Sequence, residues 1–319
     1  MRIACVGKGG SGKTTTSSLL VRYLMHTNQP FLAIDADINQ HLGTAFGLTE
    51  EQISSIPELG NTLPKLKEIL KGQGTLLPDT AHMIKTSLPL EGGHLIRLQK
   101  DDSVLSHFAY PVTENGYYLR VGGFQEEDLG KRCFHAKTGG AELVLNHLLD
   151  TKDETVIVDM TAGADAFASG LFTRFDLTLI VVEPTLKSLE VYKQYKQYAD
   201  PYDVNIAVIG NKIQDEDDTE FLEEHCGKDL LGFMSASKWI KKTERGSTPP
   251  FTDLEDENMQ LLEQIIQNVS ETGKNWEKYW NQGIHFHNEN ALSWANTAIG
   301  ADVREFVDRE FLKKLSKIF

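Results

Sequence analysis

The stretch MRIACVGKGGSGKTTTSSLL, residues 1–20, decides the fold. Its apolar run Ile3–Val6 predicts a buried strand, and Thr14–Met25 predicts a helix. The segment that joins them, GKGGSGKT at 7–14, fits the pattern G-x-x-x-x-G-K-[ST] in the strand–loop–helix context that this pattern requires. The sequence therefore predicts a loop that cradles phosphate groups.

Each residue type in this loop has a physical role in holding phosphates. Glycines let backbone N–H groups turn toward phosphate oxygens, and the helix N-terminus adds its partial positive charge. We expect Lys13 to reach the β- and γ-phosphates of ATP and the Thr14 hydroxyl to bind Mg²⁺. A glycine-rich turn without a ligand is disfavoured, because lysine, threonine and flanking elements all agree. The predicted nucleotide-binding residues of the loop are Gly7, Gly9, Gly10, Ser11, Gly12, Lys13, Thr14 and Thr15.

Strand-like and helix-like segments alternate along the rest of the chain. Helix-like stretches such as Ser188–Tyr198 separate most of the short apolar runs. This alternation predicts an α/β fold, a doubly wound and mostly parallel sheet with helices on both faces. The further predicted strands are Phe31–Ile34, Tyr117–Val121, Thr155–Val158, Leu177–Val182, Ile206–Ile209 and Leu230–Met234.

Two segments depart from this alternation. Roughly 120 residues separate the second strand from Thr155, which is much longer than an ordinary crossover. Within them, about 50–115 contains several Pro and Gly residues and little periodicity, so we expect an inserted lobe. After residue 272 the chain becomes rich in Trp and Asn. We therefore expect a P-loop ATPase domain at 1–272 and a helical C-terminal extension at 273–319.

Composition limits the classes of partner and location. The net charge of −14 argues against generic nucleic-acid binding. No apolar run is long enough for a membrane span, and the chain opens directly on a strand, so no signal peptide is expected. Three cysteines give no disulfide framework, which suggests a reducing compartment. The expected location is cytoplasmic.

Polar residues follow several predicted strands, at the sheet edge where parallel sheets place their ligands. Asp35 and Asp37 end the second strand, although both could instead cap a helix beginning near Asn39. Asp159 ends TVIVD and is expected to bind Mg²⁺ directly or through water. Asn211 ends AVIGN, where a turn-forming role is the alternative. Gln214 stands where GTP-specific proteins carry an aspartate, which favours ATP.

The motif KGGSGKTT resembles that of the deviant P-loop ATPases. This family includes the septum-site-determining and chromosome-partitioning ATPases, the arsenite-pump and tail-anchored-protein-targeting ATPases, and the nitrogenase iron protein. The resemblance implies an ATP-dependent homodimer in which Lys8 crosses the interface and contacts phosphate in the partner's site. A solvated surface lysine is the alternative.

The same resemblance implies roles for the acidic and polar residues. Asp37 would position or activate the attacking water, and Asp35 would help to hold the water shell of Mg²⁺. Gly163 would belong to a switch segment that senses the γ-phosphate. Asn211 would contact the adenine edge. The catalytic set is thus Lys8, Lys13 and Asp37.

The segments CFHAKTGGAELVLNHLL, VIVDMTAGADAF and LTLIVVEPTLKSLE resemble a narrower branch, the accessory ATPases that mature nickel-dependent carbon monoxide dehydrogenase. That branch has a C-x-C metal-binding pair, whereas this chain has Cys133 and His135 at the corresponding positions. Doubled across a twofold axis, these residues would give two thiolates and two imidazoles, a set that suits Zn²⁺ or Ni²⁺. A buried thiol beside a hydrogen-bonded histidine is the alternative.

The leading function is therefore a Mg²⁺-dependent ATPase that acts as a nucleotide-gated homodimer switch on an unidentified protein client, in an accessory or maturation role. One alternative is a membrane- or DNA-associated positioning or partitioning scaffold, although the acidic charge argues against DNA. Another is a P-loop enzyme that phosphorylates a small substrate, against which Lys8 argues.

Two C-terminal patterns remain. IHFHN places His285 and His287 on one side of a predicted strand, where metal binding is an outside alternative. REFLKKLSKIF, at 309–319, predicts a basic amphipathic helix. We expect this helix to pack on the protein's own core rather than on a membrane, because acidic residues precede it and oppose an anionic bilayer.

Overall fold

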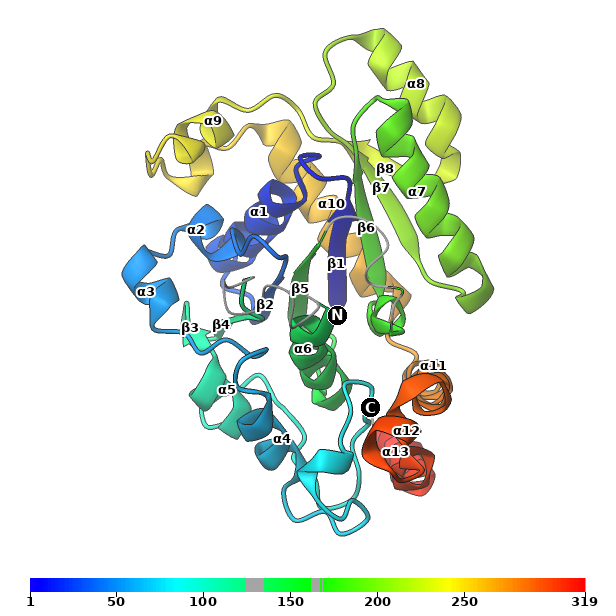
Figure 1. The fold of residues 1–319 in the computed structure, drawn as a ribbon. Helices are drawn as coiled ribbons and strands as arrows, with labels where there is room; N and C mark the ends of the chain where they lie inside the picture. The colour runs from blue at the N-terminus through cyan, green and yellow to red at the C-terminus, as the bar shows by residue number, and fades with distance from the viewer. Residues whose placement is uncertain (124–134, 162–166, 168, 319) are drawn as a thin grey trace.

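The computed structural model describes residues 1–123, 135–161, 167 and 169–318. Within them, eight strands form one sheet in the order β3-β4-β2-β5-β1-β6-β7-β8 (Figure 1). The strand pairs are parallel except for β3 and β4. The strands are β1 (Arg2–Gly7), β2 (Phe31–Ala36), β3 (Tyr110–Pro111), β4 (Gly116–Arg120), β5 (Thr155–Met160), β6 (Leu177–Val182), β7 (Ile206–Gly210) and β8 (Leu230–Phe233). The seven strands predicted between residues 3 and 234 are confirmed, and β3 is additional.

Helices cover both faces of the sheet, as predicted. Along β1, Ile3 and Cys5 belong to one apolar core, and Ala4 and Val6 belong to the other. Helices α1 and α10 complete the first core, and α6 and α7 contribute to the second. The α-helices are α1 (Lys13–His26), α2 (Leu42–Phe46), α3 (Glu50–Ser54), α4 (Leu63–Lys71), α5 (Ser103–Phe108), α6 (His135–His147), α7 (Leu186–Ala199), α8 (Glu216–Cys226), α9 (Lys238–Glu244), α10 (Asp256–Thr272), α11 (Trp276–Asn290), α12 (Asn296–Ile299) and α13 (Arg309–Ile318).

The segment 50–115, predicted as an inserted lobe, packs closely on the sheet. It contains α3, α4, α5 and β3. Its Leu66 and Phe108 are fully buried in the same core as the strands. The Leu59 N–H donates to the carbonyl of Arg120 at 3.1 Å, at the end of β4. The segment thus shares its core with the sheet, and the domain boundaries themselves stay a prediction.

The C-terminal extension is helical, with α11, α12 and α13 grouped near the start of β1 (Figure 1). The strand predicted at His285 and His287 is wrong, because both residues lie in α11. At 100° per residue two such positions point apart, so His285 is exposed whereas His287 is buried. The Nε2 of His287 lies 3.1 Å from the carbonyl oxygen of Val303, and its Nδ1 lies 3.2 Å from Thr86 Oγ1. His287 therefore joins packed segments, and no cluster of three or more metal-binding side chains occurs among the described residues.

Helix α13 docks on the protein itself, as predicted. Leu312 and Leu315 are 2% and 4% exposed and pack against Trp276 and Trp280 of α11. The opposite side of α13 carries its lysines, of which Lys313 lies 2.9 Å from Glu310. No helix in the described part of the chain is both long and apolar enough to cross a membrane. Leu312 and Leu315 of the apolar side are thus covered by protein, whereas Ile318 near the end of α13 is exposed.

We expect Leu315→Ala to lower the free energy of unfolding by roughly 2–3 kcal/mol, because the substitution leaves a cavity against α11. Ile318→Ala is the matched control, since Ile318 is 69% exposed and its truncation should cost less than about 0.5 kcal/mol. Urea denaturation measures both.

Neither protein should sediment with anionic vesicles. ATP-dependent sedimentation that Ile318→Ala weakens would instead identify α13 as a membrane anchor.

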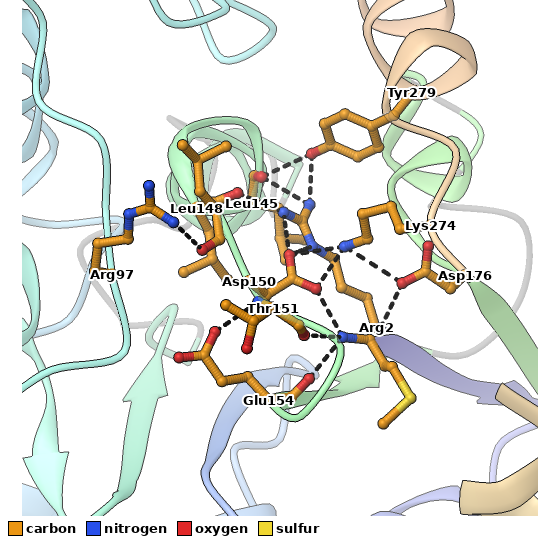
Figure 2. Close-up of polar contacts among 12 residues, drawn as sticks. Arg2, Arg97, Leu145, Leu148, Asp150, Thr151, Glu154, Asp176, Lys274 and Tyr279 are labelled. Carbon is orange, nitrogen blue, oxygen red and sulfur yellow. Dashed lines mark hydrogen bonds and ion pairs between the residues drawn. The ribbon is translucent and has the colours of Figure 1, made fainter. Parts of the chain in front are cut away.

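A buried polar network ties the extension to the sheet (Figure 2). It lies at the end of β1 opposite the phosphate loop. The side chains of Arg2 and Asp150 are fully buried, and Arg2 Nε donates to Asp150 Oδ1 at 2.8 Å. Lys274, between α10 and α11, donates to Asp150 Oδ2 at 2.6 Å. The hydroxyl of Tyr279, in α11, lies 2.5 Å from Arg2 Nη1. Burial opposes the charge of Asp150, but Arg2 and Lys274 hold its pKa well below the usual range.

The pKa of a second buried carboxyl group, that of Glu142 in α6, is shifted in the opposite direction. Burial raises its pKa to about 7, although Ser169, Lys85 and Arg174 lower it in part. Between the usual pKa and this value the folded chain holds a proton that the unfolded chain has released. The contribution of Glu142 to stability is therefore present in acid and is lost as the pH rises through about 7.

We expect Glu142→Gln to remove this pH dependence. From about pH 5 to about pH 8, the free energy of unfolding of the wild-type chain should fall relative to that of the variant by up to about 3 kcal/mol. Urea titrations of both proteins at the two pH values measure the difference. An equal difference at both pH values would show that Glu142 does not titrate in this range.

Candidate functional site

A cavity of about 330 Å³ lies at the carboxyl ends of β1, β2 and β5, where the sequence places its polar residues. The phosphate loop forms one wall, the segment after β2 forms another, and Thr161 follows β5. Ile38, Asn39 and His41 also face the cavity, although the sequence did not predict them as site residues. The lining residues are Gly9, Gly10, Gly12, Lys13, Thr14, Thr15, Asp37, Ile38, Asn39, His41 and Thr161.

The loop has the shape that a phosphate needs. Gly10 and Gly12 have φ angles of 81° and 104°, in the left-handed region that favours glycine. A Cβ on Gly12 would lie 2.2 Å from Asn211 Nδ2, so no side chain fits there. A Cβ on Gly9 or Gly10 would meet nothing within 4 Å, which leaves the backbone open to the cavity. The buried Ser11 Oγ has no partner in the described residues.

Lys13 supplies the positive charge of the cavity. Its side chain lines the cavity and the residue is only 6% exposed. Among the described residues its ammonium group makes no hydrogen bond or ion pair, apart from longer-range attraction to groups such as Asp159. A buried cation without a partner is costly. The first N–H groups of α1 also lack partners within the helix, so the cavity favours an anion.

Thr14 and Asp159 form a pair of oxygen donors beside this cation. Thr14 Oγ1 donates to Asp159 Oδ2 at 2.7 Å, and Ser17 Oγ donates to Asp159 Oδ1 at 3.0 Å. Burial raises the pKa of Asp159 to about 6, although these two hydrogen bonds lower it in part. A hydroxyl and a carboxylate beside a phosphate cradle are the donors that Mg²⁺ prefers. Ser17 was missed, although its spacing from Thr14 places both on one face of α1.

Asp35 and Asp37 have different surroundings. Asp37 lines the cavity, and its Oδ1 accepts hydrogen bonds from Asn39 N at 2.8 Å and Asn39 Nδ2 at 3.0 Å. Asp35 is fully buried and its Oδ2 accepts from the Leu42 N–H at 2.9 Å, at the start of α2. Burial, and then Asp159, raises the pKa of Asp35 to about 8. These contacts favour the helix-capping alternative for Asp35 and leave Asp37 as the carboxylate that faces the cavity.

Residues 3–270 match the family model described as the CobQ/CobB/MinD/ParA nucleotide binding domain. The chain belongs to this family. An uncharacterized ATP-binding protein of Methanocaldococcus jannaschii is 31% identical over 249 residues, which cover 76% of this chain and 88% of the relative. The carbon monoxide dehydrogenase accessory protein CooC of Rhodospirillum rubrum is 30% identical over 247 residues, which cover 77% of this chain and 87% of that protein.

Two solved structures of other proteins have the same fold as this member of the CobQ/CobB/MinD/ParA family. A putative plasmid partition protein of Borrelia burgdorferi bound to AMPPNP has a TM-score of 0.53 and 16% identity, over 84% of this chain and 97% of that one. The septum site-determining protein MinD of Pyrococcus horikoshii, complexed with Mg-ADP, has a TM-score of 0.53 and 17% identity, over 84% and 96%. At these identities the likeness concerns the fold alone.

Four predicted residues of this family member are not among those described as lining the phosphate cavity. Asn211 does not line the phosphate cavity, because its Nδ2 donates to the Ser11 carbonyl at 2.7 Å and its Oδ1 accepts from the Lys212 N–H at 2.9 Å. Its amide therefore supports the loop, and adenine recognition stays a prediction. Gly163 and Cys133 lie outside the described residues. His135 begins α6, and its side chain lies outside the described part.

A second cavity of about 340 Å³ adjoins the first between α1, α2 and α9. Thr14 and Thr15 line both cavities. Trp239 lines the far side, and the guanidinium of Arg22 lies 5.2 Å from its ring centroid.

Proposed function

We propose that this chain is a Mg²⁺-dependent ATPase that works as a nucleotide-gated homodimer and serves a protein client in an accessory role. One observation carries the proposal: the unpartnered Lys13 ammonium and Thr14 line the same cavity, and Thr14 Oγ1 is hydrogen-bonded to the buried Asp159 directly behind it. A cation, a hydroxyl and a carboxylate grouped in this way suit a phosphate chain with its metal. The relative from R. rubrum, named an accessory protein of carbon monoxide dehydrogenase, supports the accessory role.

The site residues have separate roles in binding the nucleotide, the metal and the attacking water. The loop N–H groups and Lys13 hold the phosphate chain, and Thr14 and Asp159 would hold Mg²⁺. When bound, Mg²⁺ neutralises charge on the phosphate oxygens. Asp37, fixed by Asn39, is placed to orient an attacking water. The buried Asp35 would maintain this segment through its bond to the start of α2.

The homodimer follows from Lys8. Lys8 does not line its own cavity, so a catalytic role requires phosphate on another chain. A cation supplied across an interface stabilises charge that builds up during phosphoryl transfer. A metal ion shared by Cys133 and His135 of two chains remains a prediction of the sequence.

A positioning or partitioning scaffold is the second candidate, favoured by the fold shared with a plasmid partition protein. The net charge of −14 opposes a DNA-binding surface, and the docked α13 opposes a membrane anchor. The accessory role is therefore the stronger candidate.

The oligomeric state in different nucleotides tests the proposal. With AMPPNP and Mg²⁺ we expect light scattering to give the mass of a dimer, and with ADP or no nucleotide that of a monomer. Phosphate release from ATP should require Mg²⁺ and no co-substrate, and Lys13→Ala is the binding-deficient control. A monomer in every state would contradict the switch, and phosphate transfer only to an added small molecule would indicate a kinase.

A further inference from the structure

We propose that Glu183 holds Lys8 in the single chain and that this contact opposes dimer closure. The inference rests on the proposed function, in which Lys8 acts on the partner's site. Glu183 follows β6 directly, and Lys8 follows β1, and the two strands pair in the sheet. Both side chains therefore emerge at the same edge, beside the phosphate cavity.

The contact between the two residues is direct. Lys8 Nζ lies 3.2 Å from Glu183 Oε2. The Lys8 side chain is 36% exposed, whereas the Glu183 side chain is 13% exposed. Partial burial alone would raise the pKa of Glu183, but hydrogen bonds from Lys212 and Lys8 outweigh it and lower that pKa. Glu183 is thus a charged acceptor that holds the Lys8 ammonium group.

Lys212 also binds Glu183 and can neutralise it after Lys8 has left. Its Nζ lies 2.5 Å from the other oxygen, Glu183 Oε1, and 2.6 Å from the carbonyl oxygen of Gly10. The backbone of Lys212 has a φ of 62°, an uncommon left-handed conformation for a residue other than glycine. When Lys8 leaves, Glu183 still has a cation on its second oxygen, so no buried charge is left unpaired. Lys8 can therefore move without a large penalty at Glu183.

Glu183 and a phosphate of the partner chain compete for the Lys8 ammonium group. One ammonium group cannot bond Glu183 and a phosphate of the partner chain at full strength at the same time, so closing the dimer breaks one such pair in each chain. A partly exposed ion pair changes an equilibrium constant by up to about fivefold. Because two pairs break when the dimer forms, together they should raise the dimer dissociation constant by up to about 25-fold relative to a chain without the pair. Glu183 is thus a positioning residue that sets the threshold for closure.

The test compares Glu183→Gln with Glu190→Gln, which removes the same charge from an exposed position on α7. Sedimentation with AMPPNP and Mg²⁺ should give a dimer dissociation constant about 5- to 25-fold lower for Glu183→Gln than for Glu190→Gln. In a Lys8→Ala background, Glu183→Gln should change this constant by less than about twofold. A dissociation constant for Glu183→Gln equal to or above that of Glu190→Gln would overturn the proposal.

A second readout uses the nucleotide-free chain and does not depend on dimers. Acetic anhydride labelling followed by mass spectrometry should modify Lys8 several-fold faster in Glu183→Gln than in Glu190→Gln, because a lysine held by a carboxylate reacts slowly. Equal labelling would overturn the hold of Glu183 on Lys8. If labelling differs but no chain dimerises with AMPPNP, the hold is real and the dimer function is the part that fails.

Discussion

Lys8→Ala is expected to bind ATP normally and to lose hydrolysis by a factor on the order of 10³, the range in which a cation supplied in trans contributes to phosphoryl transfer. Binding should survive because Lys8 does not line its own phosphate cavity. Fluorescent-nucleotide titration measures binding, and phosphate release at saturating ATP measures turnover. Lys13→Ala is the contrast, because loss of the cavity's own cation should weaken nucleotide binding itself.

Mixed dimers separate a trans role of Lys8 from a cis role. In a dimer of one Lys8→Ala chain and one Asp37→Asn chain, one site combines an intact Asp37 with an intact Lys8 from the partner. Random pairing should therefore restore roughly a quarter of wild-type activity if Lys8 acts in trans. If both residues act on their own chain's nucleotide, mixing restores nothing. Near-wild-type hydrolysis by Lys8→Ala alone would exclude any catalytic role for this lysine.

The phosphate site could be predicted from the sequence because its residues are close together along the chain. Residues 7–14 fix loop, lysine and threonine in one run, and the flanking strand and helix are long enough to give clear patterns. Asp159 was readable because it ends a strongly apolar strand. By contrast, β3 has two residues, one of them a proline, and such an element has no periodicity to detect.

The parts that the sequence could not supply depend on contacts between distant segments. Glu183 meets Lys8 only because β1 and β6 are neighbours. Asp35 and Asp37 look alike in sequence, and the start of α2 at Leu42 is what gives them different partners. His287 was misplaced because five residues of alternation fit a strand, whereas the burial of α11 depends on segments near Thr86 and Val303.

The largest loss of stability should come from Asp150→Asn. Asp150 is the buried acceptor for both Arg2 and Lys274, which link β1 to the C-terminal extension (Figure 2). A neutral amide would leave Arg2, Lys274 and the amino group of Met1 without their shared counter-ion. Removing one partner of a buried ion pair costs about 3–5 kcal/mol. The lower end, about 3 kcal/mol, is expected because Asp176 Oδ2 remains 3.3 Å from Lys274 Nζ. Urea denaturation measures this loss.

The chain offers a matched control in Asp203→Asn. Asp203 Oδ2 lies 2.6 Å from Lys278 Nζ, but its side chain is 94% exposed, so its loss should cost less than about 1 kcal/mol. A second change isolates the cause: Lys274→Met in the Asp150→Asn background removes one unpaired cation and should recover part of the stability. ATP binding by folded Asp150→Asn should be unchanged, because the network lies at the far end of β1 from the loop. If Asp150→Asn and Asp203→Asn lose equal stability, the buried network contributes no more than a surface pair, and the apolar packing of α11 and α13 alone must hold the extension in place.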